Sequence, residues 1–384
     1  MKIPLVDICD FQGGTQPPKD EWIDHEEPGY IRMLQIRDFT QSEKNNIEYV
    51  KDTSNLKKCT PDDILIGRYG ASVGKILTGL SGAYNVAIVK TVPNKEKVCP
   101  QFLFHYFNAP YFQNHISSVG SRAAQAGFNK DDLGKLYFPL LPLDEQRRIA
   151  AVLDKVSDLI AKRREQLDKL DELVKARFVE MFGDPEFNLR NWPIVSISDV
   201  CTVGSSKRIY QSEQTFDGVP FLRISDLNHL IDTGDFCPSL FISEEKYQEL
   251  QQRGQVPIEG DILVTSRGTL GRCYIIKTTD RFYFQDGMIS WISNLSNEIT
   301  SLFIAYLFDM QSIKRQIESM QAGSTVSYLS IDMIKRLKIM LPDRNLQKQF
   351  GAFVDQTNKS KLTIQQSLDK LEVLKKALMQ QYFG

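Results

Sequence analysis

The sequence lacks the features that define several protein classes. Its cysteines stand far apart with no CxxC pair, so neither a disulfide framework nor a zinc ribbon is predicted. They are Cys9, Cys59, Cys99, Cys201, Cys237 and Cys273, and we interpret them as buried free thiols. No stretch approaches the roughly 18 apolar residues of a membrane helix, and the N-terminus carries no signal-peptide core. We therefore expect a cytoplasmic protein with no membrane partner.

Signatures of catalysis and of cofactor binding are also missing. GASVGK (70–75) is one residue short of a P-loop and has Ile76 where the magnesium-binding hydroxyl belongs. The four histidines show no metal-ligand spacing, and no HExxH, GxSxG or dinucleotide motif occurs. The sequence also has no Asn/Asp-Pro-Pro-aromatic motif with which an amino-methyltransferase grips a flipped base. We expect no catalytic residue, no metal and no cofactor bound by this chain.

Length and charge limit the remaining possibilities. The 384 residues suggest two or three domains. The 47 Lys and Arg are balanced by 48 Asp and Glu, which gives a net charge of −1. Such balance argues against a generic polyanion binder, so any nucleic-acid surface must be a local patch.

The chain is a tandem duplication. Shifted by 201 positions, 146–183 aligns with 347–384 without a gap, and 12 of 38 residues are identical, where chance gives about two or three. Fainter echoes lie upstream, the clearest between DILIGRYGASVGK (63–75) and DILVTSRGTLGR (261–272). We infer two variable globular units, each followed by a long helix.

The two predicted helices carry matching heptad seams. Apolar residues repeat at spacings of three and four from Leu153 to Met181, and the second copy has the same phases from Val354 to Tyr382. An amphipathic helix packed on its own domain would explain one such stripe. Two equal copies favour helices that pack against each other, antiparallel. Charged seam residues, namely Arg163, Arg177, Lys361 and Lys375, suggest register setting or a further partner.

Both globular units are predicted to mix α and β structure. Each has one or two aromatic helices, in 101–116 and 301–317, which we interpret as core elements. Candidate strands of the first unit are 30–36, 63–68, 85–92 and 136–140. Candidate strands of the second unit are 219–224, 261–265, 273–277, 288–293 and 337–341.

Loops that recur in both units are the candidate DNA-binding sites. The loop after each Asp-Ile-Leu strand combines glycines, two cations, and hydroxyl or aromatic groups, which suits phosphates and base edges. The alternative is a solvated β-hairpin whose charges have no binding role. Because the loop recurs at the same place in both units, we favour contact with DNA. Asn129 and Ser330 are expected to be helix N-caps. The predicted DNA-binding residues are Thr15, Arg68, Tyr69, Ser72, Lys75, Arg122, Gln125, Lys207, Arg208, Ser266, Arg267, Thr269, Arg272, Gln321, Ser324 and Thr325.

These residues resemble a known family. DILIGRYGASVGK, the LLPLDEQRRIAAVLDKVSDLI run and KLDELVKARFVEMFGDP, all echoed in the second half, resemble the specificity (S) subunit of Type I restriction-modification systems. The P-L-x-E-Q-x-x-I segment, from Pro142 to Ile149, is the more specific part. The second copy, PDRNLQKQF (342–350), departs from it by one inserted residue and by the loss of the Glu.

The resemblance implies an α+β fold with two mixed α/β target-recognition domains, 1–142 and 184–342. Two conserved helices, 143–183 and 343–384, would join them as an antiparallel coiled coil. Each domain would read one half of a bipartite asymmetric DNA target. The helix pair would set the gap and dock two methyltransferase subunits, which bind S-adenosylmethionine, and a restriction subunit would join the complex.

Two rival functions stay open at this point. One is an enzyme, a nuclease or a methyltransferase, which purified chain alone would reveal by cutting or methylating DNA. The other is a coiled-coil protein-interaction scaffold without nucleic acid, which the balanced charge favours. Partner binding that is insensitive to salt, with no DNA binding, would support the scaffold.

Overall fold

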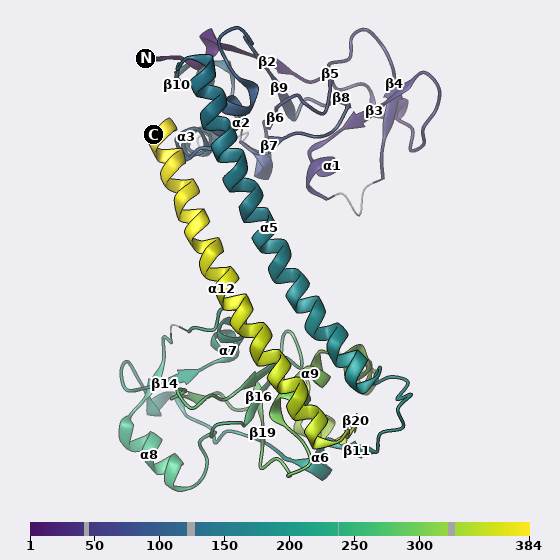
Figure 1. Cartoon of the computed structure of the whole chain (residues 1–384), viewed down its shortest axis with the longest axis vertical. Coiled ribbons are helices and arrows are strands. Elements are labelled where there is room, and N and C mark those ends of the chain that lie inside the picture. Colours follow the sequence, from purple (N-terminus) through teal and green to yellow (C-terminus); the bar gives the residue numbers. More distant parts are fainter. Residues whose placement is uncertain (42–45, 121–126, 237, 322–326) are drawn as a thin grey trace. The chain divides into compact units, whose positions relative to one another are not determined.

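The chain divides into two units, each with a globular part and segments of two long helices (Figure 1). The first unit comprises Met1–Gln166 and Ile364–Gly384, and the second comprises Leu167–Thr363. The computed structural model describes residues 1–41, 46–120, 127–236, 238–321 and 327–384. Each unit is described by itself below. None of the described helices is both long and apolar enough to cross a bilayer.

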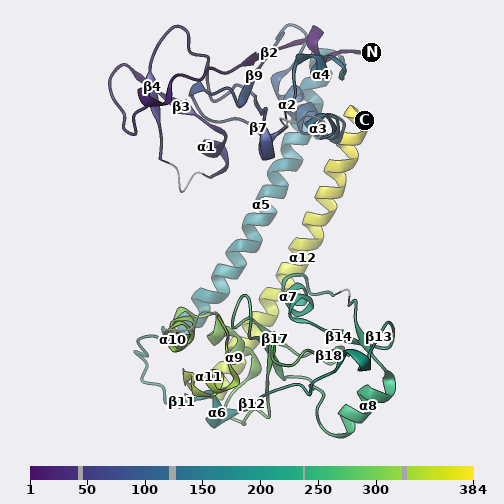
Figure 2. The ribbon, with the colours of Figure 1, turned by 180° about the vertical axis from the view of Figure 1, so that it is seen from behind.

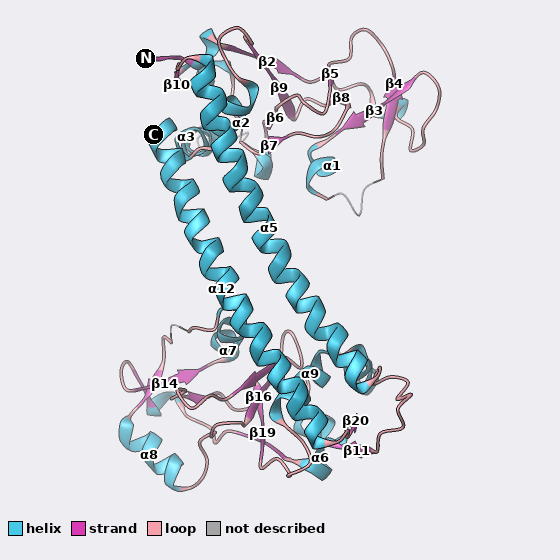
Figure 3. Ribbon diagram, viewed as in Figure 1, coloured by secondary structure: helices cyan, strands magenta, loops and turns pink. Residues whose placement is uncertain are grey.

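Three small sheets form the globular part of the first unit (Figure 3). The strands are β1 (Lys2–Pro4), β2 (Cys9–Gly13), β3 (Tyr30–Leu34), β4 (Tyr49–Lys51), β5 (Lys58–Cys59), β6 (Leu65–Gly67), β7 (Ile76–Leu77), β8 (Gly82–Tyr84), β9 (Ile88–Pro93) and β10 (Tyr137–Pro139). They pair in the orders β2-β9-β6-β7, β4-β3-β8-β5 and β1-β10. The short helices are α1 (Ile36–Thr40), α2 (Pro100–Asn108), α3 (Pro110–Gly120) and α4 (Lys130–Gly134).

The second unit is built on the same plan. Its strands are β11 (Ile194–Ser196), β12 (Thr202–Ser205), β13 (Gln214–Thr215), β14 (Val219–Leu222), β15 (Phe241–Ile242), β16 (Ile262–Thr265), β17 (Cys273–Ile275), β18 (Tyr283–Phe284), β19 (Ile289–Ser293) and β20 (Lys338–Met340). The helices are α6 (Ile197–Val200), α7 (Ile224–Thr233), α8 (Glu244–Gln252), α9 (Ser301–Asp309), α10 (Gln311–Gln321) and α11 (Ile331–Arg336). The sheets are β12-β19-β16-β17, β13-β15-β14-β18 and β11-β20.

The strand pairings of the two units correspond. The sheet β2-β9-β6-β7 matches β12-β19-β16-β17, antiparallel at every step. In the other four-stranded sheets, β3 runs parallel to β8 as β14 runs parallel to β18. The duplication read from the sequence therefore extends to these shared pairings, whereas the edge strands β5, paired with β8, and β13, paired with β15, have no counterpart in the other unit.

The predicted strands are all present; their ends lie up to three residues inside the predicted ranges, except that β9 ends one residue later than predicted. The aromatic segments 101–116 and 301–317, predicted to form one or two helices, each form two, because Ala109 and Met310 adopt extended backbone angles. Pro110 explains the first break, since the residue before proline avoids the helical region. The second break occurs without proline.

The aromatic helices are core elements, as the sequence indicated. Phe102, Tyr106 and Phe107 of α2 are fully buried, and so are Phe303 and Phe308 of α9. In each unit they pack in one apolar cluster with the two long helices. Buried aromatic rings supply much of the apolar area removed from water.

Two forty-residue helices, α5 (Leu143–Phe182) and α12 (Arg344–Phe383), pass through both units. In the first unit, Leu153 shares a core cluster with Met379 and Phe383, and Arg164 forms an ion pair with Glu372 at 2.7 Å. The contacted residues of α12 have lower sequence numbers as the sequence number along α5 increases. The two helix segments therefore run antiparallel. The two views of Figures 1 and 2 show them side by side.

The second unit contains the remaining helix segments, which are also antiparallel. Phe178 and Phe182 stack edge-on against Phe350, and Asp171 forms an ion pair with Lys361. The seam positions from Leu153 to Met181 and from Val354 to Tyr382 are buried or half-buried. Lys361, a charged seam residue, therefore pairs with a carboxylate of α5.

A buried glutamine ties the start of each long helix to its own unit. Gln146 is fully buried; its Oε1 accepts from the Cys99 amide at 2.9 Å, and its Nε2 donates to the carbonyls of Lys97 and Leu141. Gln347 repeats these bonds with Thr300, Glu298 and Pro342. Leu141 and Pro342, the last acceptors in the two copies, each lie five residues before the glutamine. The residue inserted in the second copy therefore leaves this hydrogen-bond pattern unchanged.

We expect Gln146→Ala to lower the free energy of unfolding by about 2–4 kcal/mol, because it leaves the buried Cys99 amide and two partly buried carbonyl groups without this partner. Urea titration measures the loss, and hydrogen exchange of the peptide containing Cys99 should accelerate. Gln365→Ala is the matched control, since Gln365 is exposed on α12 and its side chain donates to Asp369 one turn along the same helix. Equal effects of the two substitutions would contradict the role given to the buried amide.

Candidate nucleic-acid interface

Three loop segments of the first unit meet at one small cavity. It has a volume of about 90 Å³, and its lining includes Gly13 at the end of β2, Arg68 after β6, and Phe128 before α4. Arg68 Nε donates to the Phe128 carbonyl oxygen at 3.2 Å. Three segments far apart in the sequence therefore line one cavity, and the Arg68 side chain bonds one of them to another.

An aromatic ring locks the hairpin loop to the segment before α4. The Arg68 guanidinium lies 5.0 Å from the centroid of the Tyr69 ring, and Tyr69 forms an isolated β-bridge with Gly127. A Cβ on Gly127 would lie 2.5 Å from Tyr69 Cδ1, so the ring occupies the space that glycine leaves. Tyr69 nevertheless remains 39% exposed, which keeps part of its surface available to a ligand.

The second unit builds the same junction from different residues. Arg267 lies 4.9 Å from the ring centroid of Tyr328, the residue that corresponds to Gly127 in the 201-residue shift. The Leu329 amide donates to the Ser266 carbonyl at 3.0 Å, which joins the two loops. Each unit thus has a cation–aromatic pair where the hairpin loop meets the segment after the helix pair. Such pairs present both a stacking face and a hydrogen-bond donor to nucleic acid.

Glycine is required where each hairpin loop turns back into its second strand. Gly74 has a φ of +79° and Gly271 a φ of +76°, a region that L side chains rarely adopt. An added Cβ would also press on Ile116 of α3 or on Ile317 of α10. The loop is therefore held against the second helix of its pair, and its polar residues project from a fixed base.

The predicted DNA-binding residues differ in exposure. Tyr69, Lys75, Lys207, Arg208 and Thr269 are exposed. The half-buried set is Thr15, Arg68, Ser72, Arg267, Arg272 and Gln321. Ser266 is buried, with its Oγ bonded to Ser290 Oγ at 2.8 Å. The Ser266 side chain therefore supports the loop from inside.

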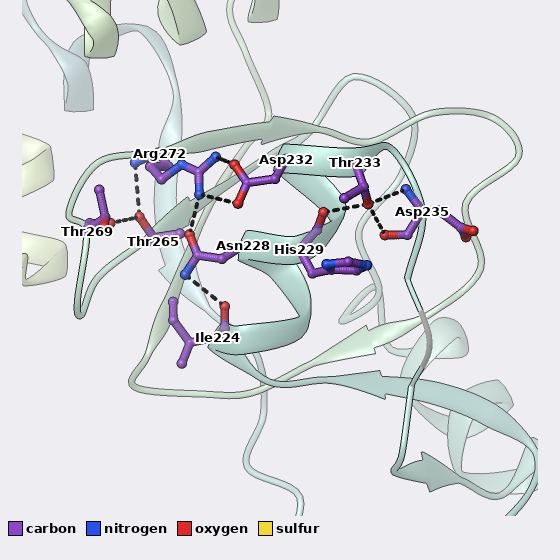
Figure 4. Close-up of polar contacts among 9 residues, drawn as sticks. All are labelled: Ile224, Asn228, His229, Asp232, Thr233, Asp235, Thr265, Thr269 and Arg272. Atoms are coloured by element: carbon purple, nitrogen blue, oxygen red, sulfur yellow. Dashed lines mark hydrogen bonds and ion pairs between the residues drawn. The ribbon is translucent and has the colours of Figure 1, made fainter. Parts of the chain in front are cut away.

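Two of the predicted cations already hold carboxylates. Arg208 Nε donates to Asp286 Oδ2 at 2.9 Å. Arg272 is bonded to Asn228 and Asp232 of α7 (Figure 4). The hydrogen bond from Arg272 holds the pKa of Asp232 below its usual range, so this carboxylate stays ionised.

Some predicted residues serve the local structure, and others cannot be placed. Asn129 and Ser330 are N-caps as expected, accepting from the amides of Asp132 and Met333. Arg122, Gln125, Ser324 and Thr325 lie outside the described residues. Thr15 Oγ1 accepts from the Lys57 amide at 3.4 Å, and Gln321 Nε2 donates to the Tyr328 carbonyl at 3.4 Å.

The five cysteines that the structure describes are buried or half-buried, and Cys237 lies outside the described residues. The five are Cys9, Cys59, Cys99, Cys201 and Cys273, and all are free thiols. Burial raises the pKa of Cys9 and of Cys201 to about 12 and that of Cys59 to about 11, which disfavours the thiolate. Within the described ranges, no three His, Cys, Asp or Glu side chains gather as a metal site would require.

Sequence reasoning missed α7 and its side chains, which include Asn228 and Asp232. The residues after β14 were not assigned to a helix, although Leu227 and Leu230 follow a helical spacing and Gly234 ends the helix at a φ of +76°. An apolar pair followed by glycine is a recognisable helix-end signal. Which side chain of α7 meets the hairpin loop could not have been read from that signal.

Comparisons with known proteins agree on one family. The family model described as "Type I restriction modification DNA specificity domain" matches residues 1–171 and 190–374. S.HindORF215P of Haemophilus influenzae is 27% identical over 76% of this chain and 74% of its own length. The Type I restriction enzyme MjaVIII specificity subunit of Methanocaldococcus jannaschii is 23% identical over 90% of this chain and 83% of its own.

Solved structures show a related fold. The crystal structure of a Type I restriction-modification S subunit from M. genitalium has a TM-score of 0.60 and 15% identity, and covers 100% of this chain and 96% of that one. A chain from a study of complex assembly and conformational transition in the type I R-M system has a TM-score of 0.60 at 17% identity, over 100% and 97% of the two chains.

The close contact between Gly127 and Tyr69 predicts that adding one methyl group at position 127 destabilises the fold. Gly127→Ala should lower the free energy of unfolding by about 1–3 kcal/mol, because the new Cβ displaces the Tyr69 ring. Gly134→Ala is the control, since its Cβ would meet no atom within 4 Å. Urea titration compares the two variants. The cost should fall but not vanish when Tyr69 is already alanine, because the new Cβ also lies 3.1 Å from the Arg68 carbonyl oxygen; an undiminished cost there would show that Tyr69 is not the obstacle.

Proposed function

Because this chain belongs to the family of Type I restriction-modification DNA specificity subunits, we propose that it selects the DNA sequence on which a methyltransferase and endonuclease complex acts. The chain is a specificity subunit and not the catalytic one. The observation that carries the proposal is the junction of cation, aromatic ring and glycine turn, present once in each unit. Each junction would read one half of a bipartite target.

The two half-sites should differ in sequence because the two junctions differ in chemistry. The first unit offers Arg68 beside Tyr69, and the second offers Arg267 beside Tyr328. A guanidinium can bond guanine through two donors, while a neighbouring ring restricts its orientation. Exposed Lys75 and Lys207 would contact phosphates, which adds affinity without sequence information.

The helix pair would set the gap between the half-sites and dock two methyltransferase subunits. Each helix is a continuous run of 40 residues, which corresponds to a helix length of about 60 Å. Apolar side chains remain exposed on the helix segments of both units: Val152, Leu159, Val373 and Leu374 in the first, and Leu173, Val179 and Leu362 in the second. Exposed apolar groups of this kind mark protein interfaces.

The partners supply what the chain does not. We propose that S-adenosylmethionine binds to the methyltransferase subunits and that a restriction subunit joins the larger complex. Residues 1–142 and 184–342 would be the recognition domains, and 143–183 and 343–384 the spacer helices. The same exposed apolar helix residues also favour the second candidate, an interaction scaffold without nucleic acid. A steep salt dependence of binding to DNA distinguishes the two.

Replacing Arg267 tests base reading in the second unit. In complex with the methyltransferase subunits, Arg267→Ala should cost about 1–3 kcal/mol of discrimination at one half-site and leave the other unchanged. Binding is measured on DNA altered in either half. If the variant weakened binding to all sequences equally, Arg267 would be a phosphate contact.

Exchanging a whole recognition domain tests the modular arrangement. Replacing 184–342 with the corresponding domain of another specificity subunit should change one half-site and keep the other half and the gap. Mapping methylated positions across a genome gives the result directly. A change in both halves would contradict the assignment of one unit to each half-site, and wild-type chain without methylation partners provides the control for background.

A further inference from the structure

The last residue of the hairpin loop has a different environment in each unit. Lys75 follows Gly74 in the first unit, and Arg272 follows Gly271 in the second, with nearly equal positive φ at the two glycines. Lys75 is exposed. The Arg272 side chain is only 26% exposed and is held by α7. Two cations at one structural position thus have different surroundings.

The guanidinium of Arg272 is bound at two points one helical turn apart (Figure 4). Its Nη1 donates to Asn228 Oδ1 at 2.9 Å and to Asp232 Oδ2 at 3.4 Å, and its Nη2 donates to the other carboxylate oxygen of Asp232. Two-point binding of a planar guanidinium restricts its direction as well as its distance. The Asn228 amide is fixed in turn, because its Nδ2 donates to the Ile224 carbonyl at 3.1 Å.

The backbone of Arg272 is tied to the base of the hairpin loop. Thr265 is fully buried, and its Oγ1 accepts from the Arg272 amide at 3.0 Å while donating to the Thr269 carbonyl at 2.5 Å. One threonine hydroxyl therefore closes the loop that carries Arg267. The chain of bonds runs without a break from α7 through Arg272 and Thr265 to the loop.

The helix itself is secured at its far end. Thr233 Oγ1 donates to the His229 carbonyl at 2.8 Å and accepts from the Asp235 amide at 3.2 Å. In the first unit the corresponding helix α1 ends at Thr40, which aligns with Asn228, and the Thr40 hydroxyl donates to the Ile36 carbonyl instead. The second unit thus has a longer helix that reaches the hairpin residue.

We propose that Arg272 is a positioning residue that fixes the loop 266–271 on α7, whereas Lys75 contacts a DNA phosphate. The inference rests on the proposed DNA-reading function. A guanidinium already paired with a carboxylate releases no DNA counterion when DNA binds, and a phosphate placed there would be repelled by Asp232. A loop ordered before binding also costs less entropy to dock, so Arg267 meets the base edge in one orientation.

The positioning role of Arg272 is tested by substituting each partner of the ion pair between Arg272 and Asp232. Arg272→Gln, Asp232→Asn and their combination are assayed in the complete complex, on DNA altered in either half-site. We expect each single change to lower discrimination at the second unit's half-site by about five- to tenfold, and the double change to add little. Arg272→Lys, which retains one of the contacts, should recover part of the loss. The slope of binding against salt should stay unchanged.

Lys75→Gln should behave differently. It should weaken binding to all sequences alike and reduce the salt slope by about 0.9. Arg281→Gln is the matched control in the second unit, because it also breaks a pair between two elements, with Glu244, and should leave discrimination unchanged.

Asp232→Asn is the variant that best separates a positioning role of Arg272 from a phosphate contact. If Arg272 were itself a phosphate contact, removing its carboxylate partner would tighten DNA binding and steepen the salt slope. Either that result or a slope reduced by Arg272→Gln would overturn the positioning role. Thermal unfolding of the same variants without DNA tests the pair separately, since coupled residues give non-additive shifts. Failure of the wild-type complex to select DNA would refute the proposed function alone, while additive unfolding shifts would refute the pairing.

Discussion

The contact on which the rest of the structure depends is the buried glutamine at the start of each long helix. Gln146 and Gln347 bond the segment that precedes α2 or α9 and a carbonyl just before the helix, so they set the direction in which the helix leaves its unit. Each helix then ends in the other unit, where Phe182 or Phe383 enters the aromatic core. Each apolar core therefore includes the end of the helix that begins in the other unit. A substitution of one glutamine would disturb both cores.

This arrangement separates the residues that support the fold from those free to vary. The aromatic helices, the glutamines and the turn glycines recur in both units, and they define where the hairpin loop and the segment after the helix pair meet. Within that frame the contacting residues differ: Tyr69 rests on Gly127, whereas Arg267 rests on Tyr328. A loop whose base is held by backbone bonds and a glycine turn can change its exposed side chains without changing its position.

Elements with strong local patterns were predictable from sequence, and contacts between distant segments were not. The duplication, the heptad seams, the aromatic core helices and the caps Asn129 and Ser330 follow from periodicity and cap chemistry. The two-residue strands carry too little pattern to detect, and α7 was not assigned. Loop composition located the hairpin loops, but Ser266 and Arg272 look like ligand contacts in sequence. Only their partners, Ser290 and Asp232, reveal that these side chains are used inside the unit.

Ion pairs on the hairpin loops and nearby segments explain part of the balanced charge of the chain. The net charge of −1 argues against DNA binding only if all cations are counted alike. Arg208 and Arg272 are neutralised by Asp286 and Asp232, whereas Lys75 and Lys207 are exposed on the same set of loops. If these loops meet DNA as proposed, pairing two of their cations with carboxylates lowers the attraction to phosphates of any sequence and leaves a larger share of the binding energy to base contacts. Pairing a cation with a carboxylate therefore orders a loop and at the same time limits non-specific affinity, which is the combination that a specificity subunit needs.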